Sequence, residues 1–382
     1  MTSPSGPPQG AGAHPGSAPA QGYAPAPTGT QPPAPPGHNG GLQGEVHTLE
    51  RAIFEVKRII VGQDRLVERM LVGLLAKGHV LLEGVPGVAK TLAVETFAKV
   101  VGGTFARIQF TPDLVPTDIV GTRIYRVGKE EFDIELGPVV VNFLLADEIN
   151  RAPAKVQSAL LEVMAERKIS IGGKTFPLPN PFLVMATQNP IEQEGVYALP
   201  EAQRDRFLFK LNIDYPTPEE EREIIYRMGV KPPEPKQILN PNDLIRLQDV
   251  AANTFVHHAL VDYVVRIVTA TREPEKFGMP DAKAWIAYGA SPRASLGIIA
   301  ASRALALIRG RDYVVPQDVV EVIPDVLRHR LVLTYDALAD EVSAETVINR
   351  IMQTVALPQV NAIPQQGHSV PTAVPAAAAS GR

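Results

Sequence analysis

A glycine-bearing turn in the first third of the chain ends in residues that can bind a phosphate. His79–Glu83 is a short apolar run that predicts a buried strand, and Lys90–Val100 predicts a helix. Lys90 could reach β- and γ-phosphates as a positive charge, and the Thr91 hydroxyl could ligate Mg²⁺. Backbone N–H groups of the turn and the start of the helix can surround an anion. We therefore predict a phosphate-binding loop, formed by Gly84, Val85, Pro86, Gly87, Val88, Ala89, Lys90 and Thr91. It departs from the G-x-x-x-x-G-K-[ST] pattern only at Ala89, whose small side chain still permits a phosphate to approach.

Two acids follow a second apolar run, at a point where a buried strand should end. Phe143–Ala146 leads directly into Asp147 and Glu148. Asp147 could hold Mg²⁺, and Glu148 could polarise a water for in-line attack on the γ-phosphate. Acids at a solvated strand end are the alternative, which the position downstream of Lys90 and Thr91 disfavours.

A third apolar run, Phe182–Thr187, precedes Asn189 and Pro190. If this strand lies between the two strands already described, Asn189 faces the γ-phosphate and can orient the attacking water. A turn asparagine before a proline is an equally good local interpretation.

Three arginines could complete such a site. Arg204 and Arg206 lie just before the apolar run Phe207–Ile213, where either could be offered to the nucleotide of a neighbouring subunit. The alternative is an ion pair with Asp205 within the chain, and nothing in the local sequence chooses between the two arginines. Arg293 follows a serine cap and a first-turn proline, so it could touch the γ-phosphate from a second domain. The alternative there is an ordinary surface arginine near a helix cap.

The elements that position these residues alternate between strands and helices up to about residue 214. Two helices over about 45–60 and 64–77 precede the first strand, and further strands are expected at 105–110 and 140–146. This alternation predicts an α/β fold with a parallel, helix-covered sheet. After Tyr215 the pattern is almost wholly helical, and we expect helices over about 218–229, 242–254, 258–271, 292–309, 316–328 and 343–356. The simplest division is an α/β domain at 45–214 and a helical domain at 215–356.

Composition and charge indicate which segments are disordered and which classes of function are disfavoured. The 382 residues include 30 glycines and 36 prolines, and 20 of these lie within residues 1–41, so we expect 1–44 and 357–382 to be disordered tails. The formal net charge of −4, without a basic block, disfavours stable nucleic-acid binding. The absence of cysteine excludes thiolate chemistry, and no apolar run is long enough for a membrane span. With no basic, apolar leader, these features predict a cytoplasmic protein.

Taken in order, the motifs from Gly84 to Arg293 resemble the MoxR family of AAA+ ATPases. The family's patterns match Glu83–Thr91, Leu144–Pro153, Ala186–Pro190, Leu199–Phe207 and Gly289–Arg293. The resemblance implies an AAA+ P-loop NTPase core followed by a helical lid. It also implies Walker A at 84–91, Walker B at 143–148, sensor 1 at Asn189, the arginine finger at Arg206 and sensor 2 at Arg293. Arg206 is preferred to Arg204 because the family's arginine directly precedes the phenylalanine. Val61, Gly62 and Gln63 resemble the segment beside the adenine.

What the resemblance implies for function is a Mg²⁺-dependent ATPase that hydrolyses ATP between subunits of a ring, commonly a hexamer. Members are thought to be chaperone-like motors that remodel protein clients, often with a von Willebrand factor A partner. This chain lacks that partner domain's Asp-x-Ser-x-Ser motif, so such a partner would act in trans. Segments 112–138 and 166–181 resemble the family's helix-2 insert and pre-sensor hairpin, which would touch clients. The second has a hairpin tip at Ile171–Lys174.

Three other functions remain open at this point. A metal-chelatase motor would show a stimulated ATPase only with chelatase partners. A DNA-translocating ring would bind DNA in a salt-sensitive way, which the balanced charge disfavours. A nucleotide-gated scaffold with little turnover is favoured only by Ala89 and disfavoured by Glu148, since a scaffold needs no residue that activates water.

Overall fold

Five parallel strands form the central sheet. The computed structural model describes residues 39–85, 87–88, 90–128, 130–189, 196–229 and 233–359. The strands are β1 (His79–Gly84), β2 (Phe105–Gln109), β5 (Phe143–Asp147), β8 (Leu183–Gln188) and β9 (Phe207–Ile213). Their order is β2-β5-β8-β1-β9, and every neighbouring pair is parallel. All five predicted strands are therefore confirmed, and β8 lies between β5 and β1 as the interpretation of Asn189 required.

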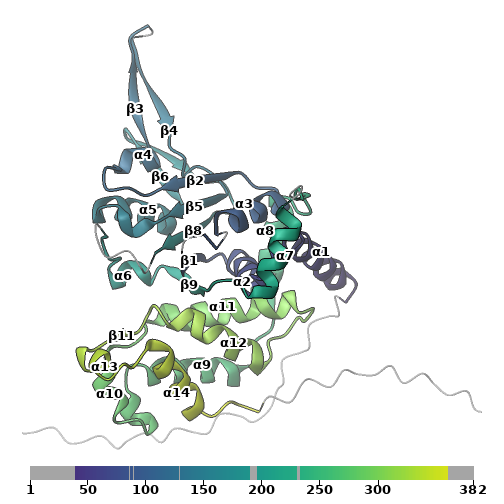
Figure 1. Ribbon diagram of the computed structural model, residues 1–382, viewed down its shortest axis with the longest axis vertical. Helices are drawn as coiled ribbons and strands as arrows, with labels where there is room; N and C mark the ends of the chain where they lie inside the picture. The colour runs from purple at the N-terminus through teal and green to yellow at the C-terminus, as the bar shows by residue number, and fades with distance from the viewer. Residues whose placement is uncertain are drawn as a thin grey trace, which may run out of the picture. The chain divides into compact units, whose positions relative to one another are not determined.

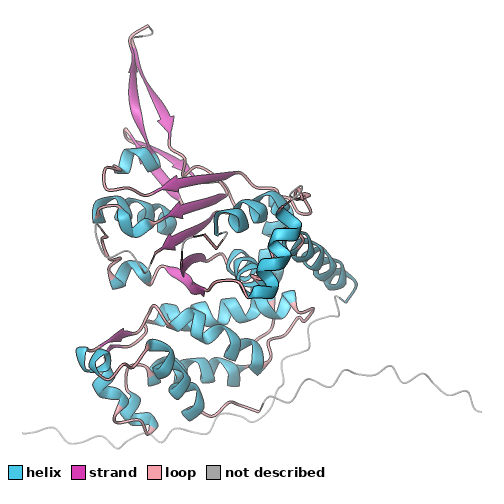
Figure 2. Cartoon of the chain, viewed as in Figure 1, coloured by secondary structure: helices cyan, strands magenta, loops and turns pink. Residues whose placement is uncertain are grey.

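The two faces of the sheet are covered by different helices (Figure 1). Alternate residues of a strand point to opposite faces, so Val80 and Leu82 belong to one core cluster and Leu81 to the other. The first cluster includes α1 (Asn39–Lys57), α2 (Asp64–Leu75) and α3 (Lys90–Val101). The second includes α4 (Pro116–Val120) and α5 (Ala154–Glu166). Figure 2 shows the strands between these helices.

Residues after β9 are mainly helical, as predicted. The principal helices are α7 (Pro218–Met228), α8 (Pro241–Asn253), α9 (His258–Ala270), α11 (Pro292–Ile308), α12 (Pro316–Leu327) and α14 (Ala344–Thr354). Each matches an expected helix to within about two residues at either end. The sequence did not predict the short elements, which are η1 (Ile149–Arg151), α6 (Glu201–Arg204), η2 (Pro274–Phe277), α10 (Ala282–Trp285), β10 (Ile286–Tyr288), β11 (Val332–Leu333) and α13 (Tyr335–Ala339). β10 and β11 pair as a small antiparallel sheet.

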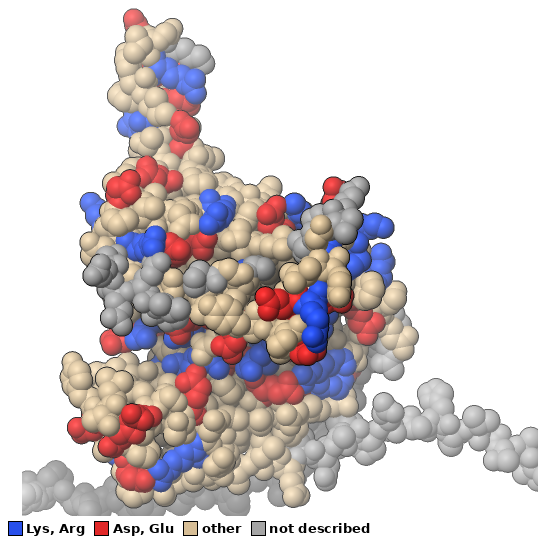
Figure 3. All heavy atoms as spheres, viewed as in Figure 1, with Lys and Arg blue, Asp and Glu red and all other residues tan. Residues whose placement is uncertain are grey.

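The helical part packs on the side of the sheet that α1–α3 cover, and its apolar residues join the same core cluster. Two ion pairs to a buried carboxylate add to this contact. The fully buried carboxylate of Asp325 on α12 accepts hydrogen bonds from Arg69 and Arg65 of α2, each at 2.8 Å. Figure 3 shows acidic and basic side chains gathered where the two parts meet. Such a pair fixes geometry more than it adds stability, because desolvation offsets much of its attraction.

The first helix begins earlier than expected. Residues 1–44 were predicted to be a disordered tail, but α1 starts at Asn39. Leu42 lies two helical turns before the buried Leu49, and it packs against the core cluster. That contact explains why the helix extends beyond Glu45 into the glycine-rich segment. Residues 1–38 and 360–382, which hold the rest of the two expected tails, lie outside the described residues.

Two hairpins form small sheets separate from the central one, and Figure 1 shows β3 and β4 projecting from the rest of the domain. Residues 112–138 form α4 and the hairpin of β3 (Gly121–Arg126) with β4 (Glu131–Leu136). Residues 166–181 contain β6 (Lys168–Ile171) and β7 (Lys174–Pro177), joined through Gly172 and Gly173 at positive φ. The tip predicted at Ile171–Lys174 is confirmed. Within the described residues, no helix is both long and apolar enough to cross a membrane.

A buried histidine begins β1. The Nδ1 atom of His79 accepts a hydrogen bond from the Val184 amide at 3.0 Å, so Nε2 carries the proton and donates to the Met164 carbonyl at 3.3 Å. Burial is the main reason why the pKa of His79 falls from 6.5 to about 4, and the positive charge of Arg167 adds to the shift. The folded chain therefore keeps this imidazole neutral throughout the physiological range.

We expect this histidine to make the fold acid-sensitive. The unfolded chain binds a proton at His79 near pH 6.5 and the folded chain only near pH 4, so stability falls as the pH drops between these values. The full shift corresponds to about 3 kcal/mol at 1.36 kcal/mol per pKa unit. Urea unfolding at a series of pH values measures this slope in wild type and His79→Gln. The variant should lose less stability on acidification, and equal slopes would contradict the assignment.

Candidate active site

The predicted phosphate-binding loop connects β1 to α3, and Lys90 is the first residue of that helix. Lys90 Nζ donates to the Gly84 carbonyl at 2.7 Å. Burial lowers the pKa of Lys90, while Asp147 and Glu148 act in the opposite direction. The Lys90 ammonium group can therefore give up its hydrogen bond to the Gly84 carbonyl and donate to a phosphate oxygen instead. Two members of the predicted loop, Pro86 and Ala89, lie outside the described residues.

The two glycines of this loop have different reasons to be glycine. A Cβ on Gly84 would lie 2.5 Å from the carbonyl oxygen of Ile213, so a side chain there would collide with β9. Gly87 has φ +86°, a conformation that other residues rarely adopt, and apart from its chain neighbours no atom of the described residues lies within 4 Å of its Cβ position. Gly84 thus serves the packing of the strand, whereas Gly87 leaves open space beside the loop.

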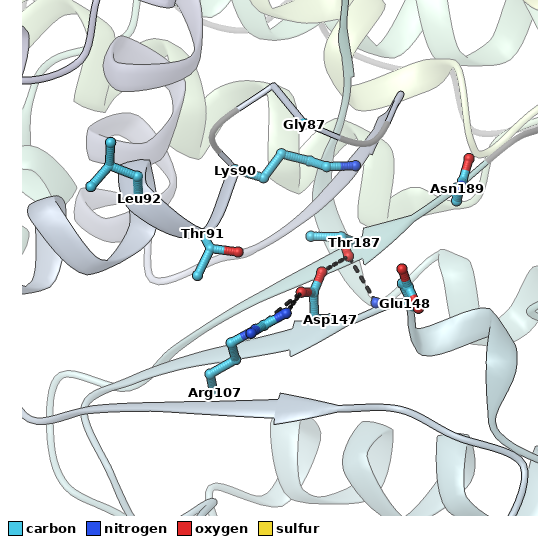
Figure 4. Close-up of a pocket in the computed structure, with 9 residues that line it drawn as sticks. All are labelled: Gly87, Lys90, Thr91, Leu92, Arg107, Asp147, Glu148, Thr187 and Asn189. Atoms are coloured by element: carbon cyan, nitrogen blue, oxygen red, sulfur yellow. Dashed lines mark hydrogen bonds and ion pairs between the residues drawn. The ribbon is translucent and has the colours of Figure 1, made fainter. Parts of the chain in front are cut away.

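Asp147 ends β5 and has two partners from neighbouring strands. Arg107 of β2 donates to Asp147 Oδ2 through Nε at 3.1 Å and Nη2 at 2.5 Å. The Thr187 hydroxyl, from β8, donates to Asp147 Oδ1 at 2.5 Å. These contacts hold the carboxylate towards the cavity that Thr91 also lines (Figure 4).

Glu148 is held from three sides. It adopts φ +56°, a left-handed conformation, and its amide donates to the Thr187 hydroxyl at 2.8 Å. Its Oε2 atom accepts a hydrogen bond from Gln109 Nε2 at 2.7 Å and lies 3.2 Å from Arg151 Nε. Thr187 therefore fixes both acids at once, and the strained backbone turns the Glu148 side chain away from the line of β5.

Lys90, Asp147 and Glu148 line one cavity of about 410 Å³. This volume is within the size range of small-molecule sites. Figure 4 shows the lining side chains converging on the cavity from the loop, β2, β5 and β8. The lining residues are Gly87, Lys90, Thr91, Leu92, Arg107, Asp147, Glu148, Thr187 and Asn189. The Thr91 hydroxyl and the Asp147 carboxylate are oxygen ligands of the kind that Mg²⁺ prefers, so the donor set fits the predicted metal. The structure thus brings together three residues of the predicted loop (Gly87, Lys90 and Thr91), the acid pair and Asn189.

A second, mainly apolar cavity lies beside the loop. Val61 and Gln63 line it, as the adenine assignment leads one to expect. Gly62 does not line it, and its φ of +72° instead makes a tight turn against the Glu220 carboxylate. Five apolar side chains that the sequence reasoning did not single out complete the wall, and these are Ile59, Ile60, Leu92, Pro216 and Ile224.

The predicted arginines lie elsewhere. Arg206 and Arg293 line a third cavity, of about 400 Å³, which shares no lining residue with the first among the described residues. Arg206 is exposed and donates to the Leu161 carbonyl, whereas Arg204 is partly buried and its Nε finds no partner among the described residues. The expectation that Arg293 reaches the phosphate cavity of its own chain is wrong for this structure. The helical part packs against α2 and the edge strand β9, and the start of α11 lies at Asp205, which is 3.6 Å from Arg293 Nη1.

Asp205, which lies between Arg204 and Arg206 in the sequence, contacts three residues of the helical part. It accepts hydrogen bonds from Arg330 Nε at 2.8 Å and from the Ser291 hydroxyl at 2.9 Å, and Arg293 Nη1 lies 3.6 Å away. The predicted alternative of an ion pair with Asp205 is thus real, but its main partner is the buried Arg330 rather than Arg204 or Arg206.

The sequence reasoning missed Arg107 and Gln109. Both residues could have been predicted to lie at the site. Alternate residues of β2 point to one side of the sheet, and that strand ends beside the two acids. Thr187 was noted only as the end of a strand. Its contacts with both Asp147 and Glu148 depend on the order of the strands, which no local pattern specifies.

Comparison with known proteins identifies the class. The model of the ATPase family associated with various cellular activities (AAA) matches residues 79–209, and the AAA lid domain model matches residues 281–351. A putative ATPase from Cytophaga hutchinsonii has a similar solved structure, with a TM-score of 0.79 and 44% identity over 83% of this chain and 97% of that one. The fold, the loop and the acid pair therefore define an AAA ATPase, an enzyme that hydrolyses ATP.

Similarity to individual proteins identifies the family within this class of ATPases. Chaperone MoxR1 of Mycobacterium tuberculosis is 82% identical over 91% of this chain and 93% of its own length. Protein MoxR of Paracoccus denitrificans is 34% identical over 72% of this chain and 86% of its own. The chain belongs to the MoxR family of AAA+ ATPases.

Proposed function

We propose that this chain is a Mg²⁺-dependent ATPase that works as a ring and hydrolyses ATP at the contact between subunits. One observation carries the proposal. The groups that can bind a γ-phosphate and activate the attacking water line one cavity, whereas Arg206 and Arg293 line another. A site that combines both sets requires two subunits in a head-to-tail arrangement, which closes into a ring when the rotation allows it.

Each residue has a defined task in this proposal. Lys90 and the backbone amides at the start of α3 hold the phosphates. Thr91 and Asp147 would hold Mg²⁺, which supplies positive charge to the phosphate oxygens. Glu148 accepts a proton from the attacking water while Asn189 orients that water.

The neighbouring subunit contributes the arginines. Arg206 stabilises the negative charge that develops on the transferred phosphoryl group. Arg293 approaches the same phosphate from the neighbour's helical part. The contact between Arg293 and the phosphate would thus form between two subunits, and not within one chain as expected from the sequence.

The adenine would occupy the cavity beside Val61 and Gln63. Its wall is mainly apolar, as a base requires, and it adjoins the loop because Gly87 and Leu92 line both cavities.

The protein client would contact the β3–β4 hairpin. Tyr125, Val127 and Phe132 are exposed there, by 49%, 78% and 60%. Large apolar side chains exposed together mark an interaction surface. A relative named as a chaperone makes remodelling of a protein the activity to expect. A hexameric ring, a von Willebrand factor A partner in trans and a cytoplasmic location complete the proposal on the grounds of the family resemblance.

Replacement of Lys90 by alanine should weaken ATP binding by about ten- to a hundredfold, since a hydrogen bond to a charged group contributes about 1.5–3 kcal/mol. Fluorescent-nucleotide titration measures this effect. Lys99→Ala is the matched control, because Lys99 lies on the same helix and is exposed. Equal affinities in the two variants would remove Lys90 from the phosphate site.

Steady-state hydrolysis as a function of protein concentration tests the proposal as a whole, with light scattering on the same samples. Specific activity should rise as the oligomer forms. Activity that stays constant while the oligomer appears would show that each subunit carries a complete site.

A further inference from the structure

The outer face of α7 and the start of α11 carry exposed apolar side chains that the proposed site does not use. Ile225 and Tyr226 on α7 are 62% and 76% exposed, and Leu296 on α11 is 72% exposed. Large apolar side chains exposed on elements that flank the two cavities are candidates for a contact surface.

Helix α7 lies at the edge of the nucleotide site. Pro216 and Ile224 face the apolar cavity beside the loop, and the next two residues, Ile225 and Tyr226, are turned outwards. Figure 1 shows α7 beside α3, which starts at the phosphate-binding loop. A subunit that reaches this nucleotide site from outside must therefore pass close to the outer face of α7.

Leu296 lies beside the arginines on the other face of the chain. It follows Arg293 by one helical turn, so the two side chains share a face of α11. The next residue, Gly297, lines the same cavity as Arg206 and Arg293. Any contact that brings Arg293 to a neighbour's phosphate also brings Leu296 to that neighbour.

The charges of the two faces are complementary. The first turn of α7 contains Glu219, Glu220 and Glu221. The cavity that Arg206 and Arg293 line, called the arginine cavity below, contains four basic residues besides the buried Arg330, namely Lys77, Arg167, Arg206 and Arg293. Opposite charges of this kind set the orientation of two subunits and speed their encounter.

We infer that α7 of one subunit docks against the start of α11 of a second copy of this chain, with Ile225 and Tyr226 packed on Leu296. The inference rests on the proposed function, because it takes the direction of approach from the shared site. It adds the apolar contact that holds the two subunits together while the arginines act.

The test uses the full-length chain and light scattering with ATP, on a Glu148→Gln background that limits turnover. Tyr226→Lys and Leu296→Glu should each weaken assembly by at least about tenfold, as expected when a side chain central to an interface is lost. The double variant places opposite charges across the contact, so it should recover assembly. Val265→Ser on α9, which removes a half-exposed apolar side chain lining none of these cavities, is the matched control and should assemble normally.

Fluorescent-nucleotide binding at low protein concentration separates misfolding from lost contact, because these variants retain the residues proposed to bind nucleotide within one chain, among them Lys90 and Thr91. Assembly of both single variants at the wild-type concentration would overturn the docking surface while leaving the shared site intact. Single variants that weaken assembly without recovery in the double variant would also overturn the pairing of α7 with α11. A parent chain that forms no oligomer at any concentration with ATP would overturn the proposed function and this inference together.

Discussion

Replacement of Glu148 by glutamine should leave ATP binding nearly unchanged and reduce turnover by about 10²- to 10⁴-fold, the usual contribution of a general base. The amide keeps the shape of the side chain, and its oxygen can still accept the hydrogen bond from Gln109. It cannot take a proton from water. Fluorescent-nucleotide titration and steady-state hydrolysis measure the two effects separately.

The contrast with Lys90→Ala makes this prediction specific. Lys90 lies in the phosphate-binding loop, so its loss should appear first in affinity. The Glu148 side chain contacts Gln109 and Arg151, neither of which lies in the phosphate-binding loop, so its loss should appear in turnover alone. Glu148→Gln turnover close to wild type would assign water activation to another residue.

Replacement of Arg206 by alanine should lower turnover by about 10³-fold or more, which is the range for an arginine finger, and leave ATP affinity largely intact. The guanidinium is exposed on a face that does not belong to the chain's own phosphate cavity, so no cis contact with nucleotide is lost. Hydrolysis assays above the assembly concentration, with nucleotide titration in parallel, measure this.

Arg204→Ala is the matched control for Arg206→Ala. Arg204 lies two residues away but is partly buried and does not line the arginine cavity, so its loss should affect hydrolysis much less. Arg206→Lys keeps the charge but loses the planar fork of donors, and should retain only part of the activity. A reversed order of effects, with Arg204→Ala inactive and Arg206→Ala active, would transfer the role to Arg204.

Local sequence patterns pointed to five polar residues of the first cavity, although for Asn189 a turn before a proline was an equally good interpretation. Lys90, Thr91, Asp147, Glu148 and Asn189 were identified from strand ends and a glycine turn, and the structure gathers them in one cavity. Parallel strands place their carboxyl ends at one edge of a sheet, so knowing that the strands exist nearly determines where these residues meet.

The position of Arg293 required information that local patterns do not contain. Its serine cap and helix start were predicted correctly, because capping depends on adjacent residues. The placement of that helix depends on contacts between residues far apart in sequence, such as the one between Arg69 and Asp325. For the same reason the contacts of Thr187 with both acids became visible only once the strand order was known.

A mixing experiment tests the shared site most directly. Lys90→Ala lacks the phosphate-binding lysine and Arg206→Ala lacks the arginine, so each variant alone should be nearly inactive. In a mixed ring, an Arg206→Ala subunit supplies Lys90 and Glu148 while a Lys90→Ala neighbour supplies Arg206. Equal mixing should restore about a quarter of the sites if subunits join at random through a head-to-tail interface. Activity that does not rise above that of the separate variants, in samples shown to form mixed oligomers, would contradict a catalytic site built from two subunits.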